Sequence, residues 1–313
     1  MRFSICQETA IGARRANQDR MGYCYTRDAL LMLLADGMGG HIQGEVAATI
    51  ALQTVSALFQ EVAVPHVKKP EGFLEDALYA AHREIHRYRA LHALPETPRT
   101  TIVACLVQHG VAQWAHCGDS RLYWMRGGRV QGRTRDHTRV ESLIAQGLLD
   151  ASAARTHPDR NKLFNCLGAP GVPSIEMSEP TRLEAGDVIL LCSDGLWNAL
   201  PDEAMALHLA AEGVVRAVPK LVQQAEAVAG ASSDNVTALA MMWDDAGPAH
   251  GEAGVITTAL VPLGAVTTTI HAPRQGEPDA AESMDSFNDG DIEQAIAEIR
   301  DAIERTSRLT SKP

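Results

Sequence analysis

Apolar residues occur along this chain in short uninterrupted runs and in stripes of helical spacing, and each pattern predicts a different element. Residues 30–35 are all apolar, too few to cross a membrane, and they end at Asp36 in a glycine-rich turn. A second run, residues 188–192, ends in the same way just before Asp194. Each run predicts a buried strand that presents a carboxylate at its end, beside glycines that let a ligand approach the backbone.

The remaining patterns predict the order of helices and strands. Helical spacing of apolar positions predicts helices over residues 45–62, 72–91, 140–149, 202–212 and 214–229. Short apolar or alternating runs predict further strands over residues 2–8, 21–26, 100–109, 111–117, 121–125, 129–132, 175–183 and 236–243. Because the central strands follow one another through tight turns, with helices clustered before and after, we expect an α+β fold with antiparallel sheets instead of alternating βαβ units.

Residues 150–168 show weak periodicity, and we expect an irregular surface segment there, of the kind that moves or contacts substrate.

Composition and charge restrict the possible partners. The chain has 313 residues, of which 45% are hydrophobic, enough for one large domain or two small ones. Its net charge is −11, and residues 244–313 hold 13 acidic and 5 basic side chains, so the tail carries −8 and the body only −3. A nucleic-acid partner is therefore not expected, because phosphate binding needs a basic patch. The start of the chain lacks a signal-peptide run and no segment could span a membrane, so we expect a cytoplasmic protein.

Cysteine and histidine positions do not indicate a zinc site. The six cysteines have no CxxC spacing and lie mostly in apolar runs, so we expect them to be reduced and buried. His82 and His86 are four residues apart, a spacing that can chelate a metal, but arginines lie between and around them. A solvated polar helix face is the interpretation we prefer for this pair.

The composition changes after residue 243. Residues 244–288 are rich in Gly, Pro, Ala, Thr and acidic residues, as in a linker, whereas residues 1–243 have the patterns of a folded domain. Helical spacing returns in residues 289–313, where isoleucines at 292, 296, 299 and 303 follow a coiled-coil seam over the predicted helix 289–309. Such a helix can pack on the body, self-associate or bind another protein, and the sequence leaves these three open.

Four carboxylates occur in matching settings at strand ends. They are Asp36, Asp119, Asp194 and Asp234. If the strands share one core, these ends can converge, and burial together would raise the pKa of the carboxylates unless cations neutralised them. Two or more divalent metals, bridged about 3.5–4 Å apart, resolve that conflict, and Mg²⁺ or Mn²⁺ prefers such oxygen ligands. Each aspartate taken alone has a simpler explanation as a turn or helix cap.

The loop GARRANQD adds cationic side chains near the start of the chain. Arg14 and Arg15 can bind a phosphate or carboxylate through two parallel hydrogen bonds, and Asp19 can support a metal directly or through water. A solvated turn explains the same residues.

The segments GARRANQD, ADGMGGHIQGE, TTIVACLV, GDSRLYW, TRDHT, LCSDGLW and SDNVT, in this order, resemble the metal-dependent protein phosphatases of the type 2C family, bacterial branch. The resemblance covers about residues 4–243. It implies a four-layer α-β-β-α sandwich, in which two antiparallel sheets pack face to face and helices cover each, with the metals at one end. It also implies hydrolysis of phosphoserine and phosphothreonine in proteins, opposing a Ser/Thr kinase.

The resemblance also implies roles for individual residues. Asp36 corresponds to the carboxylate that bridges the first two of two or three Mn²⁺ or Mg²⁺ ions, and Gly37 to the residue that lends its carbonyl. Asp194 and Asp234 correspond to other ligands of the first metal, Asp19 to support of the second, and Asp119 to a ligand of a third that shares Asp194. Arg14 corresponds to the arginine that binds the substrate phosphate. A metal-held water would attack phosphorus in line, without a covalent intermediate.

Several positions depart from the family pattern. Gln18 stands where many members have Glu, and Arg99 stands where they usually have Gly. Met38 occupies the position of a histidine proposed as general acid in some relatives. His41 can take that role or can cap the following helix. The alternatives to a protein phosphatase are a catalytically weak scaffold of the same fold that acts through its tail helix, and a hydrolase of small phosphoesters.

Overall fold

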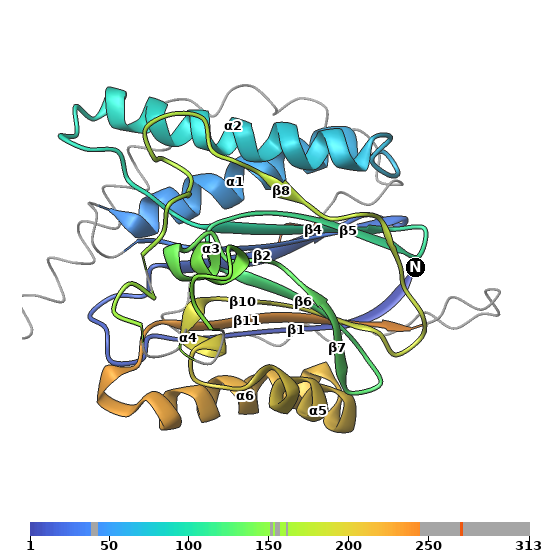
Figure 1. Cartoon of the computed structure of the whole chain (residues 1–313). Coiled ribbons are helices and arrows are strands. Elements are labelled where there is room, and N and C mark those ends of the chain that lie inside the picture. The colour runs from blue at the N-terminus through green and yellow to red at the C-terminus, as the bar shows by residue number, and fades with distance from the viewer. Residues whose placement is uncertain (39–42, 151–152, 154–156, 161, 245–269, 272–313) are drawn as a thin grey trace, which may run out of the picture. The chain divides into compact units, whose positions relative to one another are not determined.

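The computed structural model describes residues 1–38, 43–150, 153, 157–160, 162–244 and 270–271. Two sheets form its centre (Figure 1). The first has the strand order β1 (Arg2–Ala10), β11 (Val236–Asp244), β10 (Val188–Cys192), β6 (Arg121–Arg126) and β7 (Arg129–Arg133). All of its pairings are antiparallel. The N-terminal strand therefore lies beside the last long strand of the described chain.

The second sheet is built around the hairpin-connected strands in the first half of the chain. Its order is β12 (Ile270–His271), β2 (Asp19–Tyr25), β3 (Ala29–Asp36), β4 (Ile102–Gln108), β5 (Val111–Cys117) and β8 (Glu176–Met177), and β9 (Thr181–Arg182) also pairs with β5. Its pairings are antiparallel except for the parallel contact of β12 with β2.

Helices cover the outer face of each sheet (Figure 1). The long helices α1 (Gly44–Val62) and α2 (Pro70–Leu91) pack on the second sheet, and α5 (Asp202–Glu212) and α6 (Val214–Ala229) pack on the first. Shorter elements are α3 (Arg139–Ala145), the single-turn α4 (Asp194–Trp197) and the 3₁₀ turn η2 (Gly230–Ser232). The four-layer α-β-β-α sandwich expected from the sequence is confirmed.

Strand β3 is apolar at every position from Leu30 to Ala35, and its surroundings explain why polar residues do not alternate with apolar ones. Leu31 and Leu33 face the helices α1 and α2, whereas Leu30, Met32 and Leu34 face the other sheet. Both faces of the strand are therefore buried, and each fully buried leucine contributes roughly 1.5–3 kcal/mol. This burial fixes where the strand ends, and so where Asp36 lies.

Most predicted elements agree with the structure apart from shifts of a few residues at their ends. Helix α2 begins at Pro70, two residues earlier than predicted, since proline is well suited to a first helical position. The predicted helix over 140–149 ends at Ala145. The predicted strand over 175–183 is instead two short strands, β8 and β9, separated by residues 178–180.

The cysteine prediction is confirmed, since all six are free thiols in buried positions. The description of His82 as solvated was wrong. Its side chain is buried, and its Nδ1 accepts the backbone N–H of Gly168 at 3.1 Å.

The tail predictions fall largely outside the described residues. The linker 244–288 is described only at Asp244 and at β12, and the helix 289–309 is not described, so the three-part domain organisation stays a prediction. Within the described part of the chain, no helix combines the length and apolar character needed to cross a bilayer.

Candidate metal centre

Strand register brings Asp19 and Asp36 together. They are directly paired across β2 and β3, so both carboxylates lie at the same end of the second sheet. Asp36 is also tied to the neighbouring strand, because its N–H donates to Thr101 Oγ1 at 3.0 Å and its C=O accepts the Thr101 N–H at 2.9 Å. These bonds hold the carboxylate-bearing strand end against the start of β4.

The other sheet delivers the remaining carboxylates to this end. Asp194 follows β10, and Asp234 precedes β11, which pairs antiparallel with β10 so that Cys192 lies opposite Ala238. Asp119 lies in the turn from β5 to β6, and β6 begins at Arg121, opposite Cys192. The four strand-end aspartates predicted to converge therefore do so, together with Asp19.

Electrostatics within this acidic centre, defined here as Asp19, Asp36, Asp119, Asp194 and Asp234, are unfavourable for five negative charges. Burial, followed by repulsion from the other four carboxylates, raises the pKa of Asp36 well above its usual value. The pKa of Asp194 is also raised well above its usual value, mainly by burial and next by repulsion from Asp119. Burial raises the pKa of Asp19 to about 6 and that of Asp119 to about 7. The group therefore favours protons or cations.

Asp19 shows how such a cation would be received. Its Oδ2 accepts the hydroxyl of Ser193 at 2.7 Å, whereas its Oδ1 is buried without a hydrogen-bond partner. A buried carboxylate oxygen without a donor is costly unless a cation or water completes it. Mg²⁺ and Mn²⁺ prefer carboxylate oxygens as ligands, and Asp19 Oδ1 is available to such a cation while Ser193 holds Oδ2. The residues of the acidic centre therefore fit the expected metal.

Gly37 leaves room for close backbone approach. A Cβ at this position would overlap the backbone of Gly44, and its N–H donates to the carbonyl of Gln18 at 3.2 Å. The backbone after Asp36 thus lies directly against the start of α1. Met38 next to it donates its N–H to the carbonyl of Arg99 at 3.0 Å. His41 lies outside the described residues.

Arg14 is the cation closest to the acidic centre on the N-terminal loop. Its guanidinium donates to Asp234 Oδ2 at 2.6 Å, and this side chain remains 57% exposed. Asn235 holds the loop in place, since it donates to the carbonyls of Ile11 and Ala16 and accepts the N–H of Gln18. Arg15, the alternative to Arg14, is exposed. The structure therefore brings Arg14 to the carboxylates.

Another cluster, His116, His137 and Glu176, has ligand-type atoms within 4.8 Å of one another but is unsuited to a metal. His137 Nδ1 accepts hydrogen bonds from the Gly118 N–H (3.1 Å) and from Asn165 Nδ2 (2.7 Å). Burial lowers the pKa of His137, so the ring is neutral and its one proton lies on Nε2, toward Glu176. Neither nitrogen has a lone pair to offer. The ring instead fixes the turn that carries Asp119.

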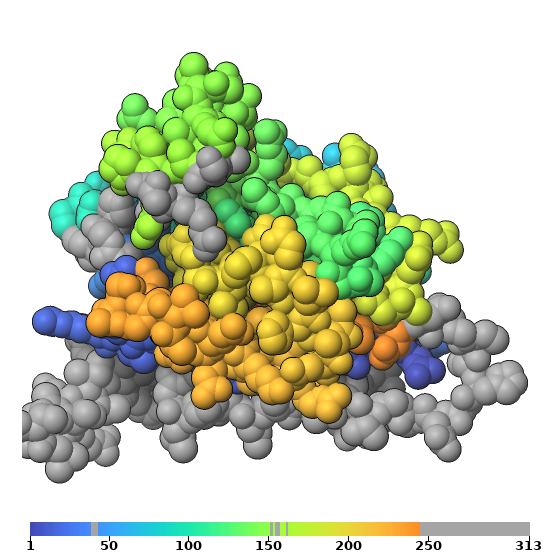
Figure 2. Space-filling view, turned by 60° about the horizontal axis from the view of Figure 1, so that its bottom comes forward, coloured from blue at the N-terminus to red at the C-terminus, as the bar shows by residue number. Residues whose placement is uncertain are grey.

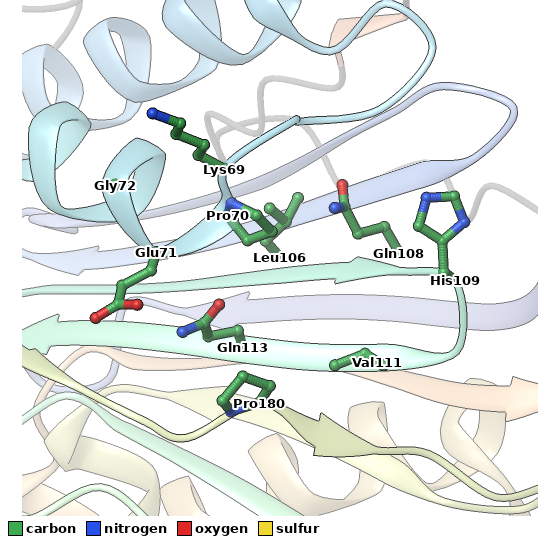
Figure 3. Close-up of a pocket in the computed structure, with 10 residues that line it drawn as sticks. All are labelled: Lys69, Pro70, Glu71, Gly72, Leu106, Gln108, His109, Val111, Gln113 and Pro180. Atoms are coloured by element: carbon green, nitrogen blue, oxygen red, sulfur yellow. The ribbon is translucent and has the colours of Figure 1, made fainter.

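Described residues outside the acidic centre also line cavities. One, of about 500 Å³, is lined by Arg121, Asp136 and Trp197 from one side and by Arg160 from the irregular segment on the other. Figure 2 shows that segment in light green above the α4–α6 part in gold. The second cavity, of about 550 Å³, lies at the opposite end of β4, between Gln108 and the N-terminus of α2 (Figure 3).

Sequence reasoning missed several side chains that contact residues of the acidic centre. Ser193, Thr101 and Trp197 each make a hydrogen bond to a residue of the acidic centre. They lay within the quoted family segments, but no local pattern assigned them a role, because each partner is distant in sequence.

Comparisons with known proteins agree with this geometry. The family model for protein phosphatase 2C matches residues 6–232. The chain belongs to this family.

Similar members are bacterial. The chain is 30% identical over 194 residues to the serine/threonine phosphatase stp of Listeria innocua, a match that covers 61% of this chain and 77% of that protein. It is 32% identical over 231 residues to PstP of Mycobacterium tuberculosis, covering 72% of this chain and 42% of that longer protein.

Solved structures give the same result. Serine/threonine phosphatase Stp1 from Staphylococcus aureus superposes with a TM-score of 0.72 at 28% identity, covering 78% of this chain and 96% of that one. The catalytic domain of PstP in complex with two manganese ions gives a TM-score of 0.65 at 28% identity, covering 78% and 99%.

Proposed function

We propose that this chain hydrolyses phosphoserine and phosphothreonine esters in proteins, with two or three Mn²⁺ or Mg²⁺ ions held by the acidic centre. The observation that carries the proposal is the convergence of five strand-end aspartates beside an exposed arginine, within the protein phosphatase 2C fold. The named relatives are serine/threonine phosphatases, and one is solved with two manganese ions. Both facts support the same reaction here.

The proposed ligands follow from the arrangement of the carboxylates. Asp36 interacts with each of the other four, which suits a bridging role, and the Gly37 carbonyl is its backbone neighbour. Asp194 and Asp234 would hold the first ion, Asp19 would support the second, and Asp119 with Asp194 would hold a third. When bound, such ions supply a water of lowered pKa and offset charge on phosphoryl oxygens.

The chain's own residues then bind and orient the substrate. Arg14, already hydrogen-bonded at the edge of the acidic centre, has donors that suit two phosphoryl oxygens. Ser193 holds the Asp19 carboxylate in one orientation, and Thr101 holds the backbone of Asp36, so this part of the acidic centre needs little rearrangement. A general-acid role for His41 stays a prediction.

The wider setting belongs to the proposal as well. We expect phosphoprotein substrates, a Ser/Thr kinase whose phosphorylation the enzyme reverses, a cytoplasmic location, and a partner or a second copy bound by helix 289–309.

The test compares three substrates with added Mn²⁺: a phosphothreonine peptide, free nucleotides and p-nitrophenyl phosphate. We expect Mn²⁺-dependent turnover that favours the phosphopeptide over nucleotides, and chelation should abolish it. Preference for nucleotides would favour the small-phosphoester hydrolase. Inactivity of both the full chain and a version ending at Trp243 would favour the scaffold.

A further inference from the structure

We infer that Trp197 is a positioning residue that fixes Asp119 relative to Asp194, and so controls a cation site shared by these two carboxylates. The inference rests on the proposed function, since it assigns a role within the metal centre. It concerns a side chain that carries no ligand atom itself.

The decisive contact is a single hydrogen bond between two turns. Trp197 Nε1 donates to the backbone carbonyl of Asp119 at 3.0 Å. Trp197 is the last residue of α4 and Asp194 is the first, so one helical turn joins the donor to the second carboxylate. Asp194 O also accepts the N–H of Asn198 at 2.9 Å, which closes that turn.

The indole ring is itself held from the other side. The guanidinium carbon of Arg121 lies 3.7 Å from the Trp197 ring centroid, a cation–π contact. Arg121 donates from two nitrogens to the two carboxylate oxygens of Asp136, at 2.8 and 2.7 Å. Both side chains of this pair are nearly buried, with exposed fractions of 11% and 6%. A buried, bidentate partner gives the ring little freedom to turn away from Asp119.

The position of Asp119 in the fold explains why such a tie matters. Its turn passes from β5 in one sheet to β6 in the other, whereas Asp194 follows β10. The residues on either side of Asp119 are anchored elsewhere, Gly118 to His137 and Ser120 to Thr101. The indole N–H holds the carbonyl of Asp119 and so resists displacement of the Asp119 backbone, from which the carboxylate projects. Trp197 therefore couples the two turns.

The experiment uses Trp197→Phe in the full chain, with Trp124→Phe as a matched control. The phenyl ring keeps an aromatic face for Arg121 but lacks the donor. Trp124 Nε1 also makes one hydrogen bond, to Asp187 Oδ2 at 3.2 Å. Bound Mn²⁺ is counted by calorimetry, and the quenching of tryptophan emission by Mn²⁺ is followed in the same titration.

We expect Trp197→Phe to weaken the weakest Mn²⁺ site about 3- to 10-fold, the range for one lost hydrogen bond, and to leave the tighter sites within about twofold. The late phase of emission quenching should disappear in Trp197→Phe and persist in Trp124→Phe. Asp119→Asn should abolish the same site, and adding Trp197→Phe to it should cause no further loss. Equal Mn²⁺ isotherms for Trp197→Phe and Trp124→Phe would overturn the inference.

Two further outcomes are separable from these. If the wild-type chain binds no Mn²⁺, the proposed function fails together with the inference. If the wild type binds Mn²⁺ and turns over phosphopeptide but Trp197→Phe binds Mn²⁺ as tightly as the wild type at every site, only the inference fails. Thermal unfolding reports whether Trp197→Phe is folded. If Trp197→Phe does not fold, Trp197→Tyr, whose side chain fills more of the space of the indole, is used in its place.

Discussion

Arg14 and Asp234 lie 220 residues apart in sequence, and their side chains meet at 2.6 Å. Their exposed fractions are 57% and 34%, so the pair contributes little to the free energy of unfolding. Its importance is local. The contact places a permanently charged guanidinium at the edge of the acidic centre, where the neighbouring carboxylates raise the pKa of Asp36 and would repel an incoming phosphate.

Arg14→Ala should therefore raise KM for a phosphopeptide about 10-fold or more, since one charge-assisted contact to phosphate is lost. Mn²⁺ affinity should change less than phosphate affinity, which inhibition by inorganic phosphate measures. Arg15→Ala is the matched control, because Arg15 is the exposed neighbour in the same loop. A larger effect from Arg15→Ala than from Arg14→Ala would assign phosphate binding to Arg15.

Asp36→Asn should lower kcat at least ~100-fold, because the amide cannot bridge cations as the carboxylate does. Asp194→Asn should behave alike. In chelator at pH 8 the same variants should unfold at an equal or higher temperature than the wild type, since each removes one of the mutually repelling charges. Asp28→Asn, at the opposite end of β3, is the control for both measurements. Near-normal rates for Asp36→Asn would count against the metal centre.

The raised pKa of Asp119 gives the protein a pH dependence with a definite sign. Folded Asp119 titrates at about 7 and unfolded aspartate near 3.8, so between these values the folded chain binds the extra proton. In the presence of a chelator, the contribution of Asp119 to the free energy of unfolding of the wild type must then fall as pH rises through that range. Asp119→Asn removes the effect, and its stability relative to wild type should increase by at least ~1 kcal/mol between pH 5.5 and 8.

Urea unfolding in chelator at several pH values measures that difference. The variant comparison is necessary because burial lowers the pKa of His116 and His137, which has the opposite effect on the pH dependence of the wild type. A difference that stays constant from pH 5.5 to 8 would contradict the assignment. Saturating Mn²⁺ should suppress the loss of stability in the wild type, because cations take the place of the protons.

The sequence predicted the acidic centre because apolar runs determine where strands end. β3 and β10 are buried on both faces, so their apolar runs are uninterrupted; Asp36 ends β3, and Asp194 follows β10 after Ser193. The segment 175–183 has no such constraint, and Pro180, which cannot donate to a ladder, interrupts it between β8 and β9. Helix α4 was missed because its four residues contain an Asp-Gly pair that is equally typical of a turn.

Contacts between distant segments account for the remaining differences. The burial of His82 depends on Gly168, 86 residues away, which no periodicity in α2 could indicate. Ser193 reaches Asp19 across 174 residues, and Trp197 reaches Asp119 across 78. The local pattern of apolar residues predicts where strands and helices end. The side chains that hold the residues of the acidic centre are brought there by tertiary packing, which the local pattern does not show.

Thr101→Val tests the bonds that orient Asp36. The substitution nearly preserves shape but removes the Oγ1 that accepts the Asp36 N–H and pairs with Ser120 Oγ at 2.6 Å. Two buried polar groups lose their partner, so the free energy of unfolding should fall by about 1–3 kcal/mol. Mn²⁺-dependent kcat should fall as well. Thr54→Val in α1, where the hydroxyl donates to Ile50 O of its own helix, should leave kcat unchanged.

Gly195→Ala should damage the centre without touching a carboxylate. A Cβ at Gly195 would overlap the carbonyl oxygen of Asn235, so the turn that carries Asp234 must move away from the turn that carries Asp194. We expect a loss of about 1–3 kcal/mol in the free energy of unfolding, together with weakened Mn²⁺ binding. Gly72→Ala in α2 is the control, because its Cβ would meet no atom within 4 Å. It should stabilise the chain by about 0.5–1 kcal/mol and leave Mn²⁺ binding unchanged. If both variants bind Mn²⁺ as tightly as the wild type, the spacing of Asp194 and Asp234 does not set metal affinity.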